Sequence, residues 1–259
     1  MLRGTPSELD LFRGQRLISV ARRGKFLAFE FERDRMVLNP MLTGRLGFAA
    51  PGDKPWPQTA FVFDFLERQP DVTSPINEPW LRDVAWLPPA DTPVQLRYRD
   101  ATRMGKLYLL PAGVQRTVAG WDEQGPDADD PALTLDTWRV RIARHSGQLK
   151  NLLRNQDFVA GIGNAYSDEI LWDARLAPFR TRASLADAEV DALYEATRQV
   201  LSRAIGQLRD LVPPRLEVEQ RKFLSVHAKG GEACPRCGTR LTEVKAGGFV
   251  TTYCRNCQR

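Results

Sequence analysis

Histidine is scarce in this sequence, with His145 and His227 the only two among 259 residues. Neither lies in a metal-ligand or nucleophile pattern, so we expect a surface or packing role for both. The chain also has no apolar run near the roughly 18 residues that a membrane-spanning helix needs. The segment Met1 to Arg16 contains no apolar core of a secretory signal. We therefore expect a cytoplasmic protein without a membrane segment.

The composition is that of a globular chain, with 42% hydrophobic and 27% charged residues. The length allows one large domain or two moderate ones. The formal net charge is +5, and the segment from Pro214 to Arg259 carries nine Lys or Arg against four Asp or Glu. A local positive field of this kind suits a polyanion such as nucleic acid. A solvated basic tail would explain the same excess.

Residues 1–120 have the pattern of a β-sandwich. From Phe26 to Phe31, Leu27, Phe29 and Phe31 alternate with Ala28 and Glu30, so they would line one face of a strand. Further short strands, separated by Pro, Gly and Asp, are predicted at Met36–Leu38, Gly44–Phe48, Ala60–Phe65, Val94–Tyr98 and Lys106–Leu110. Two stacked sheets are the natural closure for such a series.

The period changes after the segment Trp121 to Asp136, which holds six acidic residues, no basic ones and two prolines. This composition predicts a linker over 121–136. Beyond it, helical spacing predicts a helical module over 137–210, with helices at Trp138–His145, Gln148–Asn155, Ala165–Ala174 and Asp187–Leu208. A loop and a small terminal unit over 211–259 complete a two-domain α+β fold.

All four cysteines lie close to the C-terminus, in the pattern C-x2-C-x16-C-x2-C formed by Cys234, Cys237, Cys254 and Cys257. Two CxxC knuckles bring four thiolates into the tetrahedral arrangement that a structural Zn²⁺ site requires. Disulfides are the competing interpretation, but a cytoplasmic thiol pool opposes them. We expect one structural zinc ion that folds the tail and performs no chemistry.

Two strands are predicted between the knuckles, at Leu241–Val244 and Phe249–Tyr253, which gives a zinc-bound β-hairpin. Basic residues surround this hairpin: Arg236, Arg240, Lys245, Arg255 and Arg259. A finger that contacts phosphates is therefore favoured over an isolated structural clip.

The segment QLKNLLRNQDFVAGIGNAYSDEILWDARLAP, from Gln148 to Pro178, resembles the helix–two-turns–helix of the formamidopyrimidine-DNA glycosylase and endonuclease VIII family. The ending, GEACPRCGTRL through FVTTYCRNCQR, resembles the zinc finger of the same family. Weaker matches run through RRGKFLAFEF, MLTGRLGF and RYRDATRMGKLYLL. The resemblance implies a monomeric base-excision-repair protein that acts on oxidised bases and abasic sites in double-stranded DNA, with one zinc ion.

The residues of the helical motif also have a physical interpretation that does not depend on the resemblance. Gly161 and Gly163 permit a tight turn, and we expect Asn164 to cap the following helix, whose exposed amides bind phosphate. By resemblance, the DNA-contacting residues are Lys25, Leu42, Arg103, Met104, Lys150, Gly163, Asn164, Lys245 and Arg255. Of these, Lys25 matches the lysine that assists strand cleavage, whereas Leu42 and Met104 match apolar side chains that fill the gap left by a flipped base.

The start of the chain departs from the family, whose enzymes begin with a Pro-Glu pair that supplies the amine nucleophile and a proton-transfer group. This sequence begins Met-Leu-Arg-Gly-Thr-Pro, and the first helix is also missing. The nitrogen of Pro6 is an amide and cannot act as that nucleophile. The alternatives are a start codon placed too late, which we favour, and a damaged-DNA-binding protein without chemistry. An RNA-binding module is a third possibility.

A second departure lies in the finger. The glycosylase branch carries an arginine a few residues before the third cysteine, where this sequence has Gly247, Gly248 and Phe249. Phosphate binding by the finger would then fall on Lys245, Arg255 or backbone amides.

Overall fold

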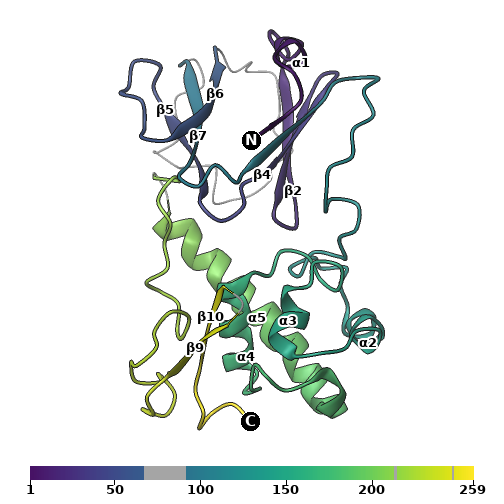
Figure 1. Cartoon of the computed structure of the whole chain (residues 1–259), viewed down its shortest axis with the longest axis vertical. Helices are drawn as coiled ribbons and strands as arrows, with labels where there is room; N and C mark the ends of the chain where they lie inside the picture. Colours follow the sequence, from purple (N-terminus) through teal and green to yellow (C-terminus); the bar gives the residue numbers. More distant parts are fainter. Residues whose placement is uncertain (67–91, 213–214, 247) are drawn as a thin grey trace.

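The computed structural model describes residues 1–66, 92–212, 215–246 and 248–259. The chain forms a β-sandwich half and a helical half that also carries the C-terminal hairpin (Figure 1). The strands of the sandwich are β1 (Leu2–Arg3), β2 (Leu17–Arg23), β3 (Phe26–Phe31), β4 (Arg35–Asn39), β5 (Gly44–Ala49), β6 (Thr59–Phe65), β7 (Val94–Asp100) and β8 (Lys106–Leu110). The predicted α+β architecture is confirmed, and six strands predicted from the sequence form within two residues of their expected bounds.

Two sheets make the sandwich. One has five strands in the order β1-β8-β4-β3-β2, and the other has three in the order β5-β7-β6. The alternation in β3 decides which side chains enter the space between the sheets: Phe29 is 2% exposed there, with Leu27 and Phe31 partly buried beside it. Ala28 faces the opposite side and packs against Val37. Period-two patterning alone therefore placed β3 correctly.

One end of the sandwich faces the helical half (Figure 1). The register pairs Leu27 with Leu38 and Leu38 with Leu107, so the start of β3, the end of β4 and the start of β8 lie at the same level. We call this the junction end of the sandwich, because the turn between β2 and β3 meets the helical half here. Strand ends and their loops supply the side chains at this surface.

The first residues are more ordered than the sequence suggests. A five-residue helix, α1 (Pro6–Asp10), forms where no helix was expected, because Thr5 and Glu8 make a capping box. Residues Leu2 and Arg3 pair in parallel with β8. Phe12, just after α1, is 7% exposed and closes one end of the space between the sheets.

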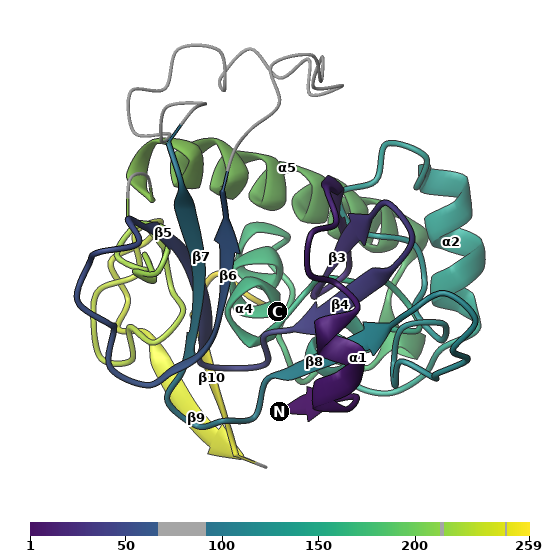
Figure 2. The same cartoon turned by 90° about the horizontal axis from the view of Figure 1, so that it is seen from above.

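The helical half packs around a core that includes Trp138, Leu149, Ile170 and Leu193, each fully buried. Its helices are α2 (Leu135–Ala143), α3 (Leu149–Arg154), α4 (Asn164–Asp173), the short η2 (Arg182–Ser184) and α5 (Asp187–Leu211). Viewed from above, α5 runs past both sheets along one side of the molecule (Figure 2). Within the described ranges, none of these helices is long and apolar enough to cross a membrane.

The second half of the predicted linker over 121–136 packs against the helical half. Ala128 and Leu133 are each 2% exposed and belong to the core of the helical half. The backbone there is also anchored to Ala160, because the Ala128 N–H donates to the Ala160 carbonyl and the Ala160 N–H donates to the Pro126 carbonyl. The acidic composition of the segment gave no sign that Ala128 and Leu133 would be buried, and their burial holds the segment in place.

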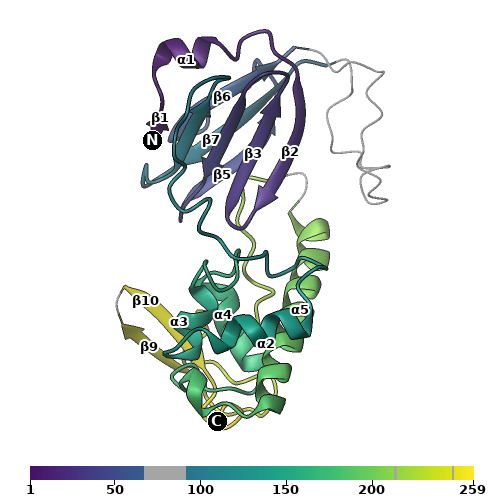
Figure 3. The ribbon, with the colours of Figure 1, turned by 90° about the vertical axis from the view of Figure 1, so that its right-hand side faces the viewer.

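The C-terminal unit is a two-stranded hairpin of β9 (Thr242–Ala246) and β10 (Phe249–Tyr253) in antiparallel register. Figure 3 shows it beside α3 and α4 in the helical half. The predicted finger hairpin is confirmed, with β10 exactly at its predicted bounds and β9 shifted by one to two residues.

Candidate nucleic-acid interface

Four thiols converge at the base of the hairpin. The Sγ atoms of Cys234, Cys237, Cys254 and Cys257 all lie within 4.8 Å of one another. Cys234 and Cys257 are 3.9 Å apart, and Cys237 and Cys254 are 3.5 Å apart. Tetrahedral zinc with Zn–S bonds of about 2.3 Å requires sulfur separations of about 3.8 Å, so the donors fit the metal. One structural zinc ion belongs here, held by four cysteines.

The zinc centre is fastened to α4. Trp172 donates its indole N–H to Cys234 Sγ at 3.4 Å, and Arg236 lies over the Trp172 ring and donates to the Trp172 carbonyl. Outer hydrogen bonds of this kind orient metal ligands. The finger is therefore a packed extension of the helical module.

Lys150 and Asp168 form a buried ion pair that joins α3, α4 and the finger. Lys150 Nζ donates to Asp168 Oδ1 at 2.6 Å, to Val250 O at 2.7 Å and to Thr251 Oγ1 at 2.8 Å. All three ammonium protons are thus engaged, and the residue is 4% exposed. The expectation that Lys150 contacts DNA is incompatible with this geometry. Its role is to hold β10 against α3.

Asp168 has two further partners. Its Oδ2 accepts from His227 Nδ1 at 2.8 Å and from the backbone N–H of Thr252 at 3.1 Å. A packing role was expected for His227, and its 7% exposure agrees with that role. Three segments distant in sequence therefore meet on one carboxylate.

Glu169, the next residue, holds the segment that precedes the finger. Its carboxylate accepts from the backbone N–H groups of Ser225, Val226 and His227, each at 2.8 Å. Charge-assisted bonds of this kind are stronger than neutral ones. Two adjacent acids on α4 thus hold the segment 225–227 and strand β10 in place.

The N-terminus of α4 differs from its prediction. The N-cap is Gly163, without a side-chain cap, and Asn164 is the first helical residue. Asn164 was expected to cap the helix, but its Nδ2 donates to Val250 O at 2.9 Å instead. Because this side chain binds the finger, no side chain among the described residues caps the first turn of α4, and its amides are available to an anion.

Lys25 reaches this helix start from the sandwich. A Cβ placed on Gly163 would lie 3.8 Å from both Cε and Nζ of Lys25. Lys25 is an exposed residue, but the chain crowded around its ammonium removes enough water to lower its pKa, and the positive charge of Arg154 lowers the pKa further. A lysine with a lowered pKa has a larger share of neutral, nucleophilic amine at a given pH.

The turn that carries Lys25 is fixed to the helical half by Gly24. The Gly24 N–H donates to Asp127 Oδ1 at 2.6 Å, and Arg22 makes ion pairs with Asp127 and Asp129. Gly24 has a φ of +57°, and a Cβ there would lie 1.9 Å from Gln124 Oε1. The backbone conformation favours glycine, and any larger residue would also force the Gln124 side chain to shift.

Two loops at the junction end present Leu42 and Met104, the apolar side chains predicted to fill the gap left by a flipped base. We call these two the wedge residues. Leu42 follows β4 and is 65% exposed, and Met104 precedes β8 and is 44% exposed. The loops are joined because Thr43 and Thr102 share a hydrogen bond of 2.8 Å. Arg103 has a φ of +54° at the tip of the second loop. The structure thus brings Leu42, Arg103 and Met104 to the same end of the sandwich as Lys25.

The two phosphate-binding residues predicted for the finger lie on different parts of it. Lys245 lies on β9, is 78% exposed and has Glu243 at 3.8 Å. Arg255 lies in the second zinc knuckle, just after the end of β10. Phe249 is at the other end of this strand, and a strand of that length spans roughly 13 Å. Gly247 lies outside the described residues. DNA contacts by Lys245 and Arg255 stay predictions.

Sequence reasoning missed Arg154, the last residue of α3. Its guanidinium carbon lies 3.6 Å from the centroid of the Phe249 ring. Its sequence context gave one available signal: Arg154 is a cation at the end of the otherwise largely apolar helix LKNLLR. That signal shows a surface position but not what the side chain contacts.

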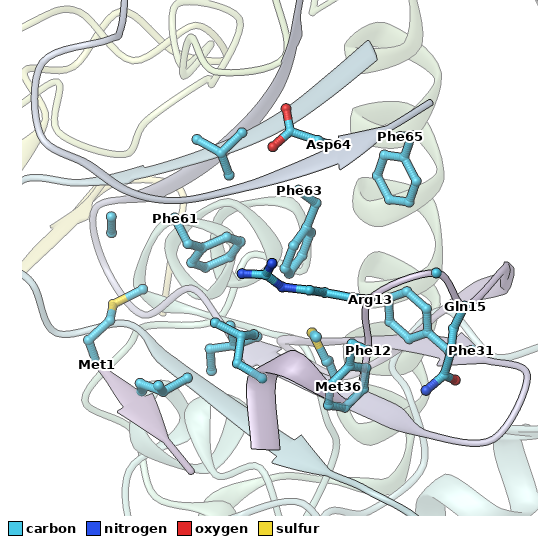
Figure 4. Close-up of a pocket in the computed structure, with 16 residues that line it drawn as sticks. Met1, Phe12, Arg13, Gln15, Phe31, Met36, Phe61, Phe63, Asp64 and Phe65 are labelled. Carbon is cyan, nitrogen blue, oxygen red and sulfur yellow. The ribbon is translucent and has the colours of Figure 1, made fainter. Parts of the chain in front are cut away.

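A cavity of about 590 Å³ lies elsewhere, between the two sheets of the sandwich. Figure 4 shows that aromatic side chains dominate it, with Phe61 and Phe63 on one side and Phe12 on the other, and that Arg13 extends into it. Among the described residues its lining is mainly apolar, with Arg13, Gln15 and Asp64 as its polar side chains, and it does not include Lys25. We therefore place the candidate site at the junction end and not in this cavity.

These features define a two-domain zinc-finger protein with a cationic, apolar-edged surface where its halves meet. Three family models match it: the formamidopyrimidine-DNA glycosylase N-terminal domain over residues 1–107, the H2TH domain over 124–211, and the zinc finger found in FPG and IleRS over 231–259. The chain belongs to the formamidopyrimidine-DNA glycosylase family.

Individual relatives agree with this assignment. The formamidopyrimidine-DNA glycosylase of Enterococcus faecalis is 30% identical over 97% of this chain and 84% of its own length. The protein of that name in Heliobacterium modesticaldum is 32% identical over 96% and 84%. The MutM (Fpg) protein of Thermus thermophilus is a solved structure with 28% identity and a TM-score of 0.73, covering 99% of this chain and 86% of that one.

A second solved structure matches at the level of the fold. The Lactococcus lactis Fpg bound to DNA containing N7-benzyl-Fapy-dG has a TM-score of 0.78 at 24% identity, covering 99% of this chain and 87% of that one.

Proposed function

We propose that this protein binds double-stranded DNA at oxidised bases and abasic sites, and that it cleaves the strand at an abasic site through amine chemistry. The observation that carries this proposal is the position of Lys25, whose ammonium lies against the Gly163 start of α4. An amine beside free helix amides can act on a sugar whose phosphate those amides bind. Family membership favours DNA over RNA as the ligand.

The wedge loops support binding at a damaged site. Leu42 and Met104 are exposed apolar side chains on two loops that the Thr43–Thr102 hydrogen bond joins. Inserted into a base stack, they would replace the contacts that a flipped or missing base leaves behind. Arg103, in the same loop as Met104, offers a charge to the opposite strand or to an orphaned base.

The chemistry follows from a neutral amine at Lys25. Its lone pair attacks C1′ of the ring-opened abasic sugar, and loss of water gives a protonated imine. Removal of a C2′ proton then drives cleavage of the C3′–O bond, and the phosphate leaves with the electron pair. Hydrolysis of the imine restores the amine. The lowered pKa of Lys25 favours the first step, because only the unprotonated form attacks.

Borohydride trapping on a duplex with one abasic site tests this function. We expect a covalent adduct whose DNA-modified peptide contains Lys25. Lys25→Arg should remove the adduct and retain binding, because the positive charge persists. Lys54→Arg, at an exposed position of the sandwich, is the matched control and should trap normally.

The other outcomes are equally informative. Binding without any adduct would make the protein a non-catalytic damage-binding member of its family. An adduct on the chain's terminal amine would move the nucleophile away from Lys25. Equal affinity for intact and abasic duplexes would refute damage recognition itself.

A further inference from the structure

Two cations lie near one another at the domain junction without an acid to balance them. Among the described residues, neither Lys25 nor Arg154 has a side-chain hydrogen bond or ion pair with another residue. Their charges interact, because Arg154 lowers the pKa of Lys25. Asp168 raises the pKa of Arg154 from a distance, but its oxygens are already bonded to Lys150 and His227. Like charges kept close with no partner indicate a site for an anion.

Arg154 is held in place by a ring and not by an acid. Its guanidinium lies 3.6 Å from the centroid of Phe249, which opens β10 and is 41% exposed. A guanidinium stacked by its face keeps its N–H donors free at the edge. Burial beside the ring lowers the pKa of Arg154, so the free charge is incompletely hydrated. An incompletely hydrated, preoriented guanidinium has less water to lose when it binds an anion.

The surrounding groups fit a phosphate. Val250, the neighbour of Phe249, accepts from Asn164 at the first turn of α4, and a Cβ placed on Gly163 at the start of that helix would lie 3.8 Å from Lys25 Nζ. Arg154, Lys25 and the first-turn amides of α4 therefore belong to one connected group of donors. Arginine is the residue that best matches a phosphate through two parallel hydrogen bonds.

We propose that Arg154 binds a backbone phosphate of the damaged DNA and that Phe249 is the positioning residue that aims it. This inference rests on the proposed DNA-binding function and adds Arg154 to the DNA-contacting residues that the family resemblance implies. The cation comes from the end of α3, whereas the finger contributes an aromatic surface.

Binding to a duplex that contains a tetrahydrofuran abasic-site analogue, measured over a range of salt concentrations, tests the proposal. Arg154→Leu should weaken binding roughly ten- to a hundredfold, the range of a lost charge-assisted hydrogen bond. The slope of log affinity against log salt should fall by about one, because one phosphate contact is lost. Arg154→Lys should recover only part of the affinity, since an ammonium lacks the planar fork.

The role of Phe249 is tested by a double-mutant cycle. Phe249→Leu alone should weaken binding, but in the Arg154→Leu background it should have almost no further effect, because the ring acts through the guanidinium. Additive effects would show that Phe249 does not position Arg154. In the free protein, ¹³C-methyl NMR of dimethylated lysines should show a higher pKa for Lys25 in Arg154→Leu, which checks their proximity without DNA.

Arg144→Leu is the charge-matched control, because Arg144 is exposed at the end of α2. Equal affinities and salt slopes for Arg154→Leu and Arg144→Leu would overturn this inference while leaving the proposed function intact. Failure of the unaltered protein to prefer the abasic duplex would instead refute the proposed function.

Discussion

Lys150 and Asp168 form an ion pair in the interior of the helical half, with Nζ 2.6 Å from Oδ1 and side-chain exposures of 5% and 0%. The pair joins two helices, and Lys150 also bonds β10 of the finger. Burial lowers the pKa of Lys150, while the hydrogen bond and charge of Asp168 act against that shift. Because neither group reaches water, each depends on the other.

The first prediction concerns this pair. Asp168→Asn should lower the free energy of unfolding by about 3–5 kcal/mol, because it leaves the Lys150 charge buried without a counter-charge. Urea unfolding followed by circular dichroism measures the change. Asp10→Asn removes a carboxylate from a surface pair whose members are 62% and 84% exposed, and it should have little effect. Equal losses in the two variants would contradict a special role for the buried pair.

The second prediction concerns zinc. Elemental analysis should find one zinc ion per chain, and Cys254→Ser should unfold the finger and weaken DNA binding while the sandwich stays folded. Metal binding and folding are coupled locally, and Cys254 is fully buried in the finger. Limited proteolysis followed by mass spectrometry locates the unfolded part. Cleavage spread evenly through the sandwich would show that the finger supports the whole molecule.

The third prediction compares two glycines, in order to separate the effect of backbone strain from the effect of contact between the two halves of the molecule. Gly24→Ala should destabilise the protein more than Gly14→Ala and should also weaken DNA binding. Both glycines have positive φ, at +57° and +72°, so the conformational cost of about 1 kcal/mol is common to both. Only Gly24 has a neighbour in the way, Gln124 Oε1 at 1.9 Å, whereas a Cβ on Gly14 meets nothing within 4 Å. Equal unfolding free energies would show that Gln124 simply moves aside.

The fourth prediction concerns the wedge. Leu42→Ala and Met104→Ala should weaken binding to an abasic duplex several-fold and leave binding to an intact duplex nearly unchanged, because apolar side chains are useful only where the stack has a gap. Fluorescence anisotropy with the two duplexes gives the ratio. Leu11→Ala removes an apolar side chain that is 53% exposed next to α1, away from the wedge loops, and should not alter it. A parallel loss on both duplexes would assign the loops to general DNA binding.

The fifth prediction concerns pH. The rate of borohydride trapping through Lys25 should rise with pH, since the neutral amine reacts, and should level off below the ordinary lysine pKa of 10.5. Arg154→Leu should move the midpoint of this profile to higher pH, because removing a nearby positive charge raises the pKa of Lys25. Single-turnover rates across the pH range measure both. A midpoint at or above 10.5 in the unaltered protein would contradict the lowered pKa.

Much of this architecture can be predicted from local pattern. The alternation in Phe26–Phe31 placed a strand and its buried face, and the spacing of the four cysteines placed a metal centre, because strands and knuckles are specified by residues close together in the chain. The packing of the segment 121–136 could not be predicted in the same way, since its charge is local but the burial of Ala128 and Leu133 depends on helices further along.

The site shows the limit of such patterns most clearly in α3. Lys150 and Arg154 are four residues apart in one short helix, and as amino acids both are plausible phosphate ligands. Lys150 is instead enclosed by Asp168 and by β10, a hundred residues away, whereas Arg154 lies on the Phe249 ring and has no side-chain hydrogen bond within the described part of the chain. The sequence by itself determined six strands of the sandwich, the finger hairpin, helices α2 to α5 and the zinc ligands, but not the short elements β1, α1 and η2. Only the packing of the finger on α3 decided that Lys150 is structural and that Arg154 is available to a ligand. The physical reason is that burial and partners come from contacts between distant segments.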